Sequence, residues 1–258
     1  MENKRQTALI TGASSGIGYE FSRLLAAEGY NTVLVARSQG KLEVLAAELR
    51  QAHGVEATVL ARDLSDPAAP TEVFATLEKQ GAQIDTLINN AGFGDYAAFA
   101  EANTSGLLDM LQLNVVALTH LARLFLPGML ARGRGHILNV GSTGSFAPAP
   151  YMAVYAATKA YVLSLSEAIY EETKDSGVSV TALCPGYTRT GFQETAGVAP
   201  DNLMSAEEVA RQGYQGMLNG KAIVVPGLQN QMLALSAKLL PRSVVRSASA
   251  NVVNEIGQ

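Results

Sequence analysis

The stretch Thr7-Ala-Leu-Ile-Thr-Gly-Ala-Ser-Ser-Gly-Ile-Gly18 decides the fold of this chain. Its first four residues predict a short strand, and the apolar residues that follow are spaced for a helix ending near Glu28. Glycines in the turn would let the backbone approach a pyrophosphate, which would rest on the positive N-terminus of the helix. A tight turn without a ligand is the alternative. The residues expected to bind a dinucleotide here are Gly12, Ser14, Ser15, Gly16, Ile17 and Gly18.

The run Gly12-Ala-Ser-Ser-Gly16 also fits Gly-x-Ser-x-Gly, the nucleophile elbow of α/β-hydrolases. Those enzymes need a catalytic histidine that follows the serine and the acid in the chain. The three histidines here are His53, His120 and His136, so no histidine lies beyond residue 136. The turn therefore favours a dinucleotide site over a hydrolase.

Short apolar runs alternate with helical patterns along the chain. This alternation predicts a doubly wound, seven-stranded parallel sheet of the Rossmann type, with helices on both faces in three α/β/α layers. We expect residues 1–258 to form one dinucleotide-binding and catalytic domain. The seven expected strands are residues 7–10, 31–36, 55–60, 86–88, 137–140, 178–183 and 222–225.

The end of the second expected strand predicts which dinucleotide binds. An acidic residue there would hold the ribose 2′-hydroxyl of NAD, whereas an arginine suits the 2′-phosphate of NADP. The chain has Ala36 followed by Arg37, and Lys41 lies one helical turn further on. NADP(H) is therefore the expected cofactor, although Lys41 could equally be an ordinary exposed charge.

Tyr155 and Lys159 are one helical turn apart, so their side chains leave the same face of a helix expected from about residue 150 to 174. A cation at that distance favours the phenolate and would lower the tyrosine pKa towards the working range. Ser142 ends the preceding strand, where its hydroxyl could meet the phenol and hold a carbonyl oxygen. Tyr170 and Lys174 have the same spacing but no such serine, and we interpret them as a solvated face.

Several ordered motifs resemble the short-chain dehydrogenase/reductase family over residues 5–195. They are Thr11-Gly-x-x-x-Gly-x-Gly18, Asn89-Asn-Ala-Gly92, Asn114, Ser142, Tyr155-x-x-x-Lys159 and Pro185-Gly186. The resemblance implies a catalytic set of Asn114, Ser142, Tyr155 and Lys159, in which Asn114 holds a water of a proton relay. It also implies cofactor contacts, namely Asp63 and Leu64 at the adenine, Asn90, Ala91 and Gly92 along the cofactor, Tyr155 and Lys159 at the ribose, and Pro185, Gly186, Thr188 and Thr190 at the carboxamide. Gly141 departs from the many members that have a second serine there.

Composition bears on the partners, disulfides and cellular location expected for this chain. With 19 basic and 23 acidic residues the net charge is −4, which argues against a nucleic-acid partner. One cysteine, Cys184, excludes an intramolecular disulfide. We expect no metal, no signal peptide and no membrane-spanning helix, since no run approaches 18 apolar residues. The expected location is the cytoplasm.

Two regions bear on the substrate and on partners. Residues 187–204 are expected to form a lid, and five apolar residues near the mouth favour a lipophilic carbonyl substrate. The amphipathic segment 227–258 has an apolar stripe followed by basic residues. It would cover a core of this chain or of a neighbour, or alternatively contact a membrane interface. The mouth residues are Phe93, Phe146, Tyr151, Met152 and Phe192; the stripe is Leu228, Met232, Leu235 and Leu239; the basic residues are Lys238, Arg242 and Arg246.

Together these patterns predict an NADP(H)-dependent oxidoreductase that reduces a carbonyl, or oxidises the matching secondary alcohol, of a lipophilic small molecule. A non-catalytic NADP-binding sensor or scaffold is the alternative. The resemblance also implies a homodimer or homotetramer, joined through the helix of Tyr155 and a long helix near residues 104–130.

Overall fold

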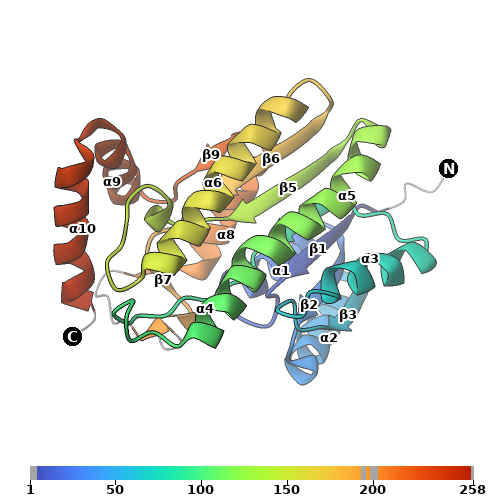
Figure 1. The fold of residues 1–258 in the computed structure, drawn as a ribbon. Coiled ribbons are helices and arrows are strands. Elements are labelled where there is room, and N and C mark those ends of the chain that lie inside the picture. Colours follow the sequence, from blue (N-terminus) through green and yellow to red (C-terminus); the bar gives the residue numbers. More distant parts are fainter. Residues whose placement is uncertain (1–4, 193–195, 198–202, 257–258) are drawn as a thin grey trace.

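The computed structural model describes residues 5–192, 196–197 and 203–256, with side chains up to residue 251. Its centre is a seven-stranded sheet in the order β3-β2-β1-β4-β5-β6-β9, in which every pair of neighbouring strands is parallel (Figure 1). The predicted doubly wound sheet is confirmed. The strands are β1 (Thr7–Thr11), β2 (Asn31–Ala36), β3 (Ala57–Ala61), β4 (Thr86–Asn89), β5 (Gly135–Val140), β6 (Val178–Leu183) and β9 (Ile223–Val224).

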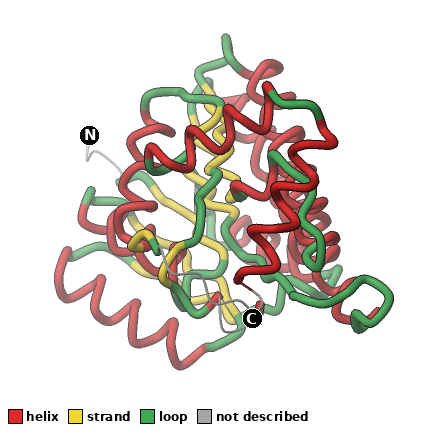
Figure 2. Tube along the Cα trace, turned by 90° about the vertical axis from the view of Figure 1, so that its left-hand side faces the viewer, coloured by secondary structure: helices red, strands yellow, loops and turns green. Residues whose placement is uncertain are grey.

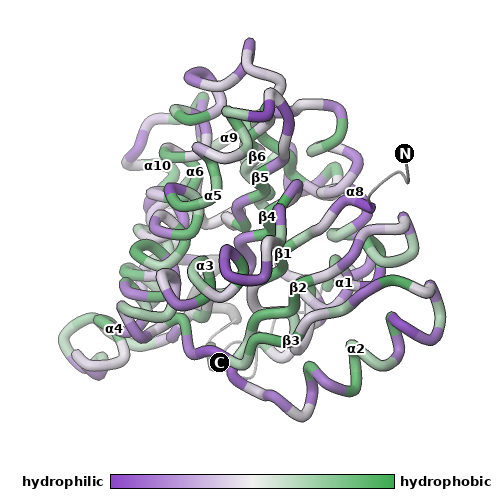
Figure 3. The backbone as a smooth tube through the Cα atoms, turned by 90° about the vertical axis from the view of Figure 1, so that its right-hand side faces the viewer, coloured by the Kyte–Doolittle hydropathy of each residue, from purple (hydrophilic) through white to green (hydrophobic). Residues whose placement is uncertain are grey.

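Helices cover both faces of the sheet. One core joins the strands to α1, α2 and α8, and a second core on the opposite face joins them to α3 and α5. Figures 2 and 3 show the strands between these two helical layers. The remaining helices include α6, which packs on β6, and the C-terminal pair α9 and α10. The bounds are α1 (Gly16–Ala27), α2 (Gln39–His53), α3 (Ala69–Lys79), α4 (Thr104–Leu111), η1 (Gln112–Ala117), α5 (Leu118–Arg132), η2 (Thr143–Ser145), α6 (Ala153–Thr173), α8 (Ala206–Leu218), α9 (Leu228–Leu239) and α10 (Arg242–Ile256).

The strands are apolar on both sides because both faces of the sheet are covered. In β1, Ala8 and Ile10 belong to the core under α1, whereas Leu9 belongs to the core under α3 and α5. This alternation follows from the two-residue period of a strand. Fully burying a large aliphatic side chain contributes about 1.5–3 kcal/mol, so the buried side chains of the strands stabilise the fold from both faces of the sheet.

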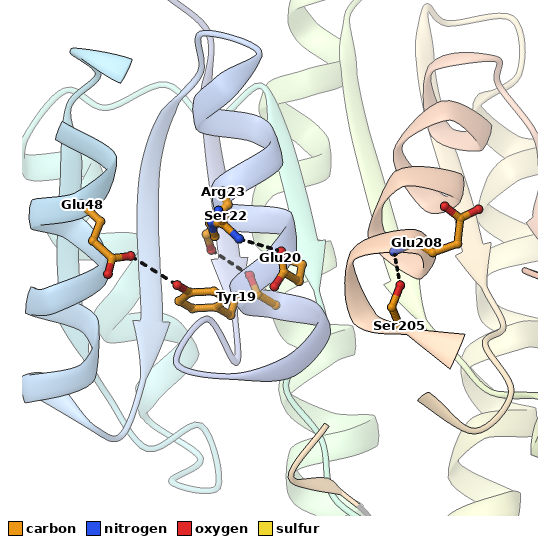
Figure 4. Close-up of polar contacts among 8 residues, drawn as sticks. Tyr19, Glu20, Ser22, Arg23, Glu48, Ser205 and Glu208 are labelled. Atoms are coloured by element: carbon orange, nitrogen blue, oxygen red, sulfur yellow. Dashed lines mark hydrogen bonds and ion pairs between the residues drawn. The ribbon is translucent and has the colours of Figure 1, made fainter. Parts of the chain in front are cut away.

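Polar contacts fix the helices that border the sheet (Figure 4). The Tyr19 hydroxyl of α1 donates to Glu48 of α2 over 3.2 Å, which ties two helices of one layer together. Ser205 caps α8 by accepting a hydrogen bond from the Glu208 backbone N–H at 3.1 Å. An N-terminal cap of this kind satisfies a helix donor that would otherwise have no partner.

Several expected boundaries are wrong by one to three residues. β3 starts at residue 57 instead of 55, β9 contains only residues 223 and 224, and α6 begins at Ala153 instead of near residue 150. A small second sheet, β7 (Thr188–Arg189) with β8 (Met204–Ser205), was not expected. These two strands bracket the predicted lid, of which residues 193–195 and 198–202 lie outside the described residues.

Among the described residues, one helix is long and apolar enough to cross a membrane by length and composition, and the expectation that no helix spans a membrane stays a prediction. The continuous helical stretch Thr104–Arg132 has 29 residues and a mean hydropathy of 1.4 in its most apolar window. The same stretch buries Leu121, Phe125 and Met129 against the sheet, as the core helix of a folded domain does.

Candidate active site

The carboxyl ends of the strands open into a cavity of about 820 Å³. β1 lies between β2 and β4, so the strand order reverses there, and ligands of doubly wound folds bind at such a switch point. The cavity brings together all but two of the predicted site residues, the exceptions being Gly18 and Asn114. Those that line it are Gly12, Ser14, Ser15, Gly16, Ile17, Arg37, Lys41, Asp63, Leu64, Asn90, Ala91, Gly92, Ser142, Tyr155, Lys159, Pro185, Gly186, Thr188 and Thr190.

The turn between β1 and α1 is shaped to receive an anion. Gly12 and Gly16 have φ angles of +65° and +57°, a region that residues with a side chain rarely adopt. Ser15 caps α1 without a side-chain hydrogen bond, so its hydroxyl does not occupy the N–H groups of the first turn. Those N–H groups and the positive end of the helix suit a phosphate.

Gly18 serves packing instead of lining the cavity. A Cβ atom at this position would collide with the carbonyl oxygen of Gly12 and would lie 2.5 Å from Asn90 Nδ2. Asn90 itself donates to the Thr11 carbonyl oxygen at 2.9 Å. The glycine therefore allows α1, the turn and the end of β4 to meet.

Thr11 is a site-building residue that the prediction missed. Its hydroxyl accepts hydrogen bonds from the backbone N–H groups of Asn90 and Ala91, both at 2.9 Å, and donates to the Ile88 carbonyl oxygen at 3.3 Å. The side chain thus joins the ends of β1 and β4 on either side of the switch point. The position of Thr11 directly before Gly12, at the start of the glycine turn, is the sequence feature that could have identified it as a site residue.

A basic edge lies at the end of β2. Arg37 and Lys41 both line the cavity, and neither forms an ion pair within the described part of the chain. Ala36 contributes no acid at this edge. The turn suits one phosphate, and the Arg37 and Lys41 side chains beside it suit a second anionic group of the same ligand.

Ser142 and Tyr155 meet across the cavity, as predicted. Ser142 lies two residues after the end of β5, and its hydroxyl accepts a hydrogen bond from the Gly144 N–H at 3.0 Å. Burial raises the pKa of Tyr155 to about 12, while a hydrogen bond with Ser142 acts in the lowering direction. The phenol is therefore protonated at neutral pH and can donate its proton.

The expected lowering of the tyrosine pKa by Lys159 is wrong in this structure. Lys159 Nζ lies 5.7 Å from the centre of the Tyr155 ring and donates to the Val140 carbonyl oxygen at 2.8 Å. Burial lowers the pKa of Lys159 to about 8, because the charged amine loses hydration. Desolvation, which spacing in the sequence does not reveal, is the largest cause of both pKa shifts.

Asn114 lies behind the wall of the cavity, in the π-helical segment η1. The Asn114 side chain accepts a hydrogen bond from the Phe93 backbone N–H at 3.1 Å and donates one to the Phe93 carbonyl oxygen at 2.9 Å. It also donates to the Thr158 hydroxyl at 3.2 Å. A Cβ on Gly92 would lie 2.9 Å from Asn114 Oδ1 and 3.5 Å from Lys159 Nζ. The structure thus brings Asn114 Oδ1 and Lys159 Nζ close to the same glycine. Single π-helical turns such as η1 are frequent at functional sites.

Four of the five apolar residues expected near the mouth line the cavity, namely Phe93, Phe146, Met152 and Phe192. Tyr151 does not, and that expectation is wrong. Its ring stacks on Tyr96 at 5.4 Å outside the cavity, and its φ of +63° turns the chain just before α6.

The C-terminal helices form part of the cavity wall, which the sequence did not reveal. Asn230, Leu233, Ser236 and Ala237 of α9 and Val245, Ala248 and Ser249 of α10 line it, together with Leu240 between the helices. Within the described residues, no group of three or more His, Cys, Asp or Glu side chains could hold a metal ion.

The fold and the site define a Rossmann-fold protein with a serine, a tyrosine and a lysine at the carboxyl edge of its sheet. The family model described as short chain dehydrogenase matches residues 6–200. The chain therefore belongs to the short-chain dehydrogenase family.

Two curated relatives carry the same name, very-long-chain 3-oxoacyl-CoA reductase. The protein from Phaeosphaeria nodorum is 38% identical over 179 residues, which are 67% of this chain and 52% of the relative. The protein from Anas platyrhynchos is 33% identical over 223 residues, covering 83% of this chain and 70% of the relative. The chain thus spans about half the length of the first of these relatives.

Two solved structures resemble the whole fold. A short-chain dehydrogenase from Sphingobium yanoikuyae in complex with NADPH is 37% identical, with a TM-score of 0.83, over 90% of this chain and 93% of its own. The bulky-bulky ketone specific alcohol dehydrogenase from Comamonas testosteroni is 33% identical, with a TM-score of 0.79, over 92% and 96% of the two chains.

Proposed function

We propose that this protein is an NADP(H)-dependent oxidoreductase that reduces a carbonyl, or oxidises the matching alcohol, of a lipophilic small molecule. The observation that carries the proposal is the placement of Ser142 and Tyr155 beside each other at Gly144, inside a cavity that also contains the glycine turn and Arg37. The relatives named as reductases, and the similar structure solved with NADPH, support it.

The residues at the cavity fit the cofactor. The open N-terminus of α1 and the glycines at 12 and 16 would hold the pyrophosphate, and Arg37 with Lys41 would hold the 2′-phosphate. Further contacts would come from Asp63, Leu64, Asn90, Ala91, Gly92, Pro185, Gly186, Thr188 and Thr190.

The chemistry divides between cofactor and protein. When bound, NADP(H) supplies or accepts the hydride. Tyr155, protonated at neutral pH, donates its proton to the carbonyl oxygen of the substrate, and Ser142 stabilises that oxygen by donating a hydrogen bond. General acid catalysis of this kind contributes about 10²–10⁴-fold, and a fixed donor at the developing oxyanion contributes about 3–4 kcal/mol.

Lys159 and Asn114 would act through Tyr155 and the cofactor. The Lys159 amine, with a pKa of about 8, can exchange a proton near neutral pH, and it lies close to Asn114 across Gly92. This arrangement supports a proton path from the site towards Asn114, and in the proposed complex Lys159 would also contact the cofactor ribose.

The cavity wall supports a lipophilic substrate. Phe93, Phe146, Met152 and Phe192 line it, and the C-terminal helices add Leu233 and Leu240. The relatives act, by their names, on very-long-chain 3-oxoacyl thioesters, and a similar structure is specific for bulky ketones. We therefore place long 3-oxoacyl thioesters and bulky ketones ahead of sugars.

The test is oxidation of NADPH against a panel of β-keto esters, steroids, quinones and long-chain 3-oxoacyl thioesters. We expect turnover of at least one lipophilic carbonyl, and Tyr155→Phe should lower kcat by at least 10²-fold while leaving NADPH binding intact. Tyr170→Phe is the matched control, because Tyr170 lies on the same helix and has the same spacing to Lys174, the residue that caps the end of that helix. A Tyr155→Phe enzyme with a tenth of the wild-type rate would contradict the assignment. Binding of NADPH with no turnover of any carbonyl would favour the sensor or scaffold.

We further propose a cytoplasmic homodimer or homotetramer joined through α6 and the α4–α5 stretch. Leu108, Leu111 and Val116 of that stretch, and Tyr161 of α6, are exposed by 60%, 39%, 46% and 39%. An exposed apolar surface of this kind supports contact with a second copy. Light scattering of the purified protein measures the mass, and a monomer at micromolar concentration would contradict the proposal.

A further inference from the structure

Helix α9 has an apolar stripe that faces away from the protein. Its residues follow steps of four, three and four, which place them within about 60° of one another around a helix. Their exposed fractions are 72% for Leu228, 61% for Met232, 57% for Leu235 and 75% for Leu239. The expectation that this outer stripe covers a core of its own chain is therefore wrong; Ala234 is the buried apolar residue that α9 contributes.

The opposite side of the same helix faces the cavity. Leu233 and Ala237 line the cavity wall. Lys238 lies on the flank of the helix between the two sides, with Nζ 5.6 Å from the centre of the Phe146 ring. Val245 anchors α10 with 8% exposure and lines the same wall. Helix α9 thus lies between the cavity and the surface that the outer stripe forms, and Figure 1 shows α10 and α9 at the outer edge of the molecule.

The charge around the outer stripe is opposite in sign to that of the chain. Residues 209–254 contain no aspartate or glutamate but five cations, although the net charge of the whole chain is −4. Of these, Lys238, Arg242 and Arg246 are exposed on α9 and α10, and none of the three forms an ion pair among the residues described. The other two cations are Arg211 and Lys221.

The positive charge beside the outer stripe favours an anionic lipid surface over a second copy of this chain as the binding partner. A second copy placed symmetrically on the outer stripe would bring the same cations towards each other, which costs free energy. An anionic lipid surface offers hydrocarbon for the stripe and negative head groups for the cations, as an amphipathic interfacial helix requires.

We propose that α9 and α10 dock this protein on an anionic lipid bilayer, with the outer stripe in the interface and Lys238, Arg242 and Arg246 at the head groups. A lipophilic substrate could then pass from the bilayer into the cavity between these helices. The substrate route rests on the function proposed above, whereas docking does not depend on it.

Binding is measured by co-sedimentation with vesicles of phosphatidylcholine and phosphatidylglycerol in equal parts, without cofactor or substrate. We expect wild-type protein to sediment with these vesicles and to need at least tenfold more lipid when the vesicles are phosphatidylcholine alone. Leu235→Glu with Leu239→Glu should weaken binding at least tenfold, and Arg242→Gln with Arg246→Gln by about thirtyfold. Val44→Glu is the matched control, because Val44 is 63% exposed on α2, away from this surface.

Three outcomes would overturn the proposal. The first is that the wild-type protein does not bind to anionic vesicles. The second is that the Leu235→Glu/Leu239→Glu protein binds them as well as wild type does. The third is that light scattering shows wild type as a dimer and the double variant as a monomer, while neither protein binds lipid. Reduction of a water-soluble carbonyl is measured in parallel. Since neither leucine lines the cavity, the double variant should keep that rate, so a failure of docking and a failure of the proposed function give different results.

Discussion

Arg37 is the single side chain on which the choice between NADP and NAD depends most. It lines the cavity at the end of β2, next to Ala36, and it has no ion-pair partner within the described residues. A hydrogen bond to a charged group contributes about 1.5–3 kcal/mol, which corresponds to about a tenfold to hundredfold change in affinity.

We therefore expect Arg37→Ala to raise the KM for NADPH about tenfold to hundredfold and to leave the KM for NADH unchanged. Steady-state kinetics with both cofactors make the measurement. Arg23→Ala is the control, because Arg23 lies on the surface of α1 and pairs with Glu20 at 3.4 Å. Equal losses with the two cofactors would show that Arg37 does not contact the 2′-phosphate.

At the scale of elements, the unit β1-turn-α1 depends on close backbone contacts. Gly18 is the point of closest approach, since a Cβ there would overlap backbone and the Asn90 amide, neither of which can move freely. Gly40 on α2 is different, because a Cβ there meets nothing within 4 Å.

Gly18→Ala should lower the free energy of unfolding by about 1–3 kcal/mol, the usual cost of overpacking, and should weaken NADPH binding by displacing the turn. Gly40→Ala should be neutral or stabilise by up to about 1 kcal/mol, since alanine favours a helix. Urea denaturation and NADPH fluorescence titration measure both effects. A Gly18→Ala protein as stable as wild type would mean that the turn can relax.

At the scale of the whole molecule, buried titratable groups should make stability depend on pH. The Lys159 pKa falls from 10.5 to about 8 on folding, so between those values the unfolded chain binds more protons and stability rises with pH. Tyr155 and Cys184 act in the opposite direction, because burial raises their pKa values to about 12 and about 11, so stability falls as the unfolded chain ionises.

Comparing wild type with Lys159→Met isolates the contribution of Lys159 to the pH dependence of stability, since both proteins keep Tyr155 and Cys184. From pH 7.5 to pH 9.5 the unfolding free energy of wild type should gain about 2 kcal/mol relative to the variant. Urea denaturation at several pH values gives the comparison, with Lys174→Met as the control at an exposed lysine. Parallel curves for wild type and Lys159→Met would show that folding does not shift the Lys159 pKa.

The sequence by itself determined the alternation of strands and helices, the glycine turn and the basic end of β2, and thereby most of the residues around the cavity. These features are local: a two-residue or 3.6-residue period sets the element and the face that is buried, and parallel strands bring their carboxyl ends to one edge. The positions of Ser142, Tyr155 and Lys159 followed from this topology together with the family resemblance.

Only the tertiary structure decided the features that depend on segments far apart in the chain. Burial by several elements sets the pKa values of Tyr155 and Lys159 against the expectation from their spacing. The bonds of Asn114 to Phe93, and the wall that α9 and α10 add to the cavity, likewise arise where distant segments meet. Desolvation and packing are sums over all neighbours in space, and a periodic pattern in the sequence records only the neighbours along one helix or strand.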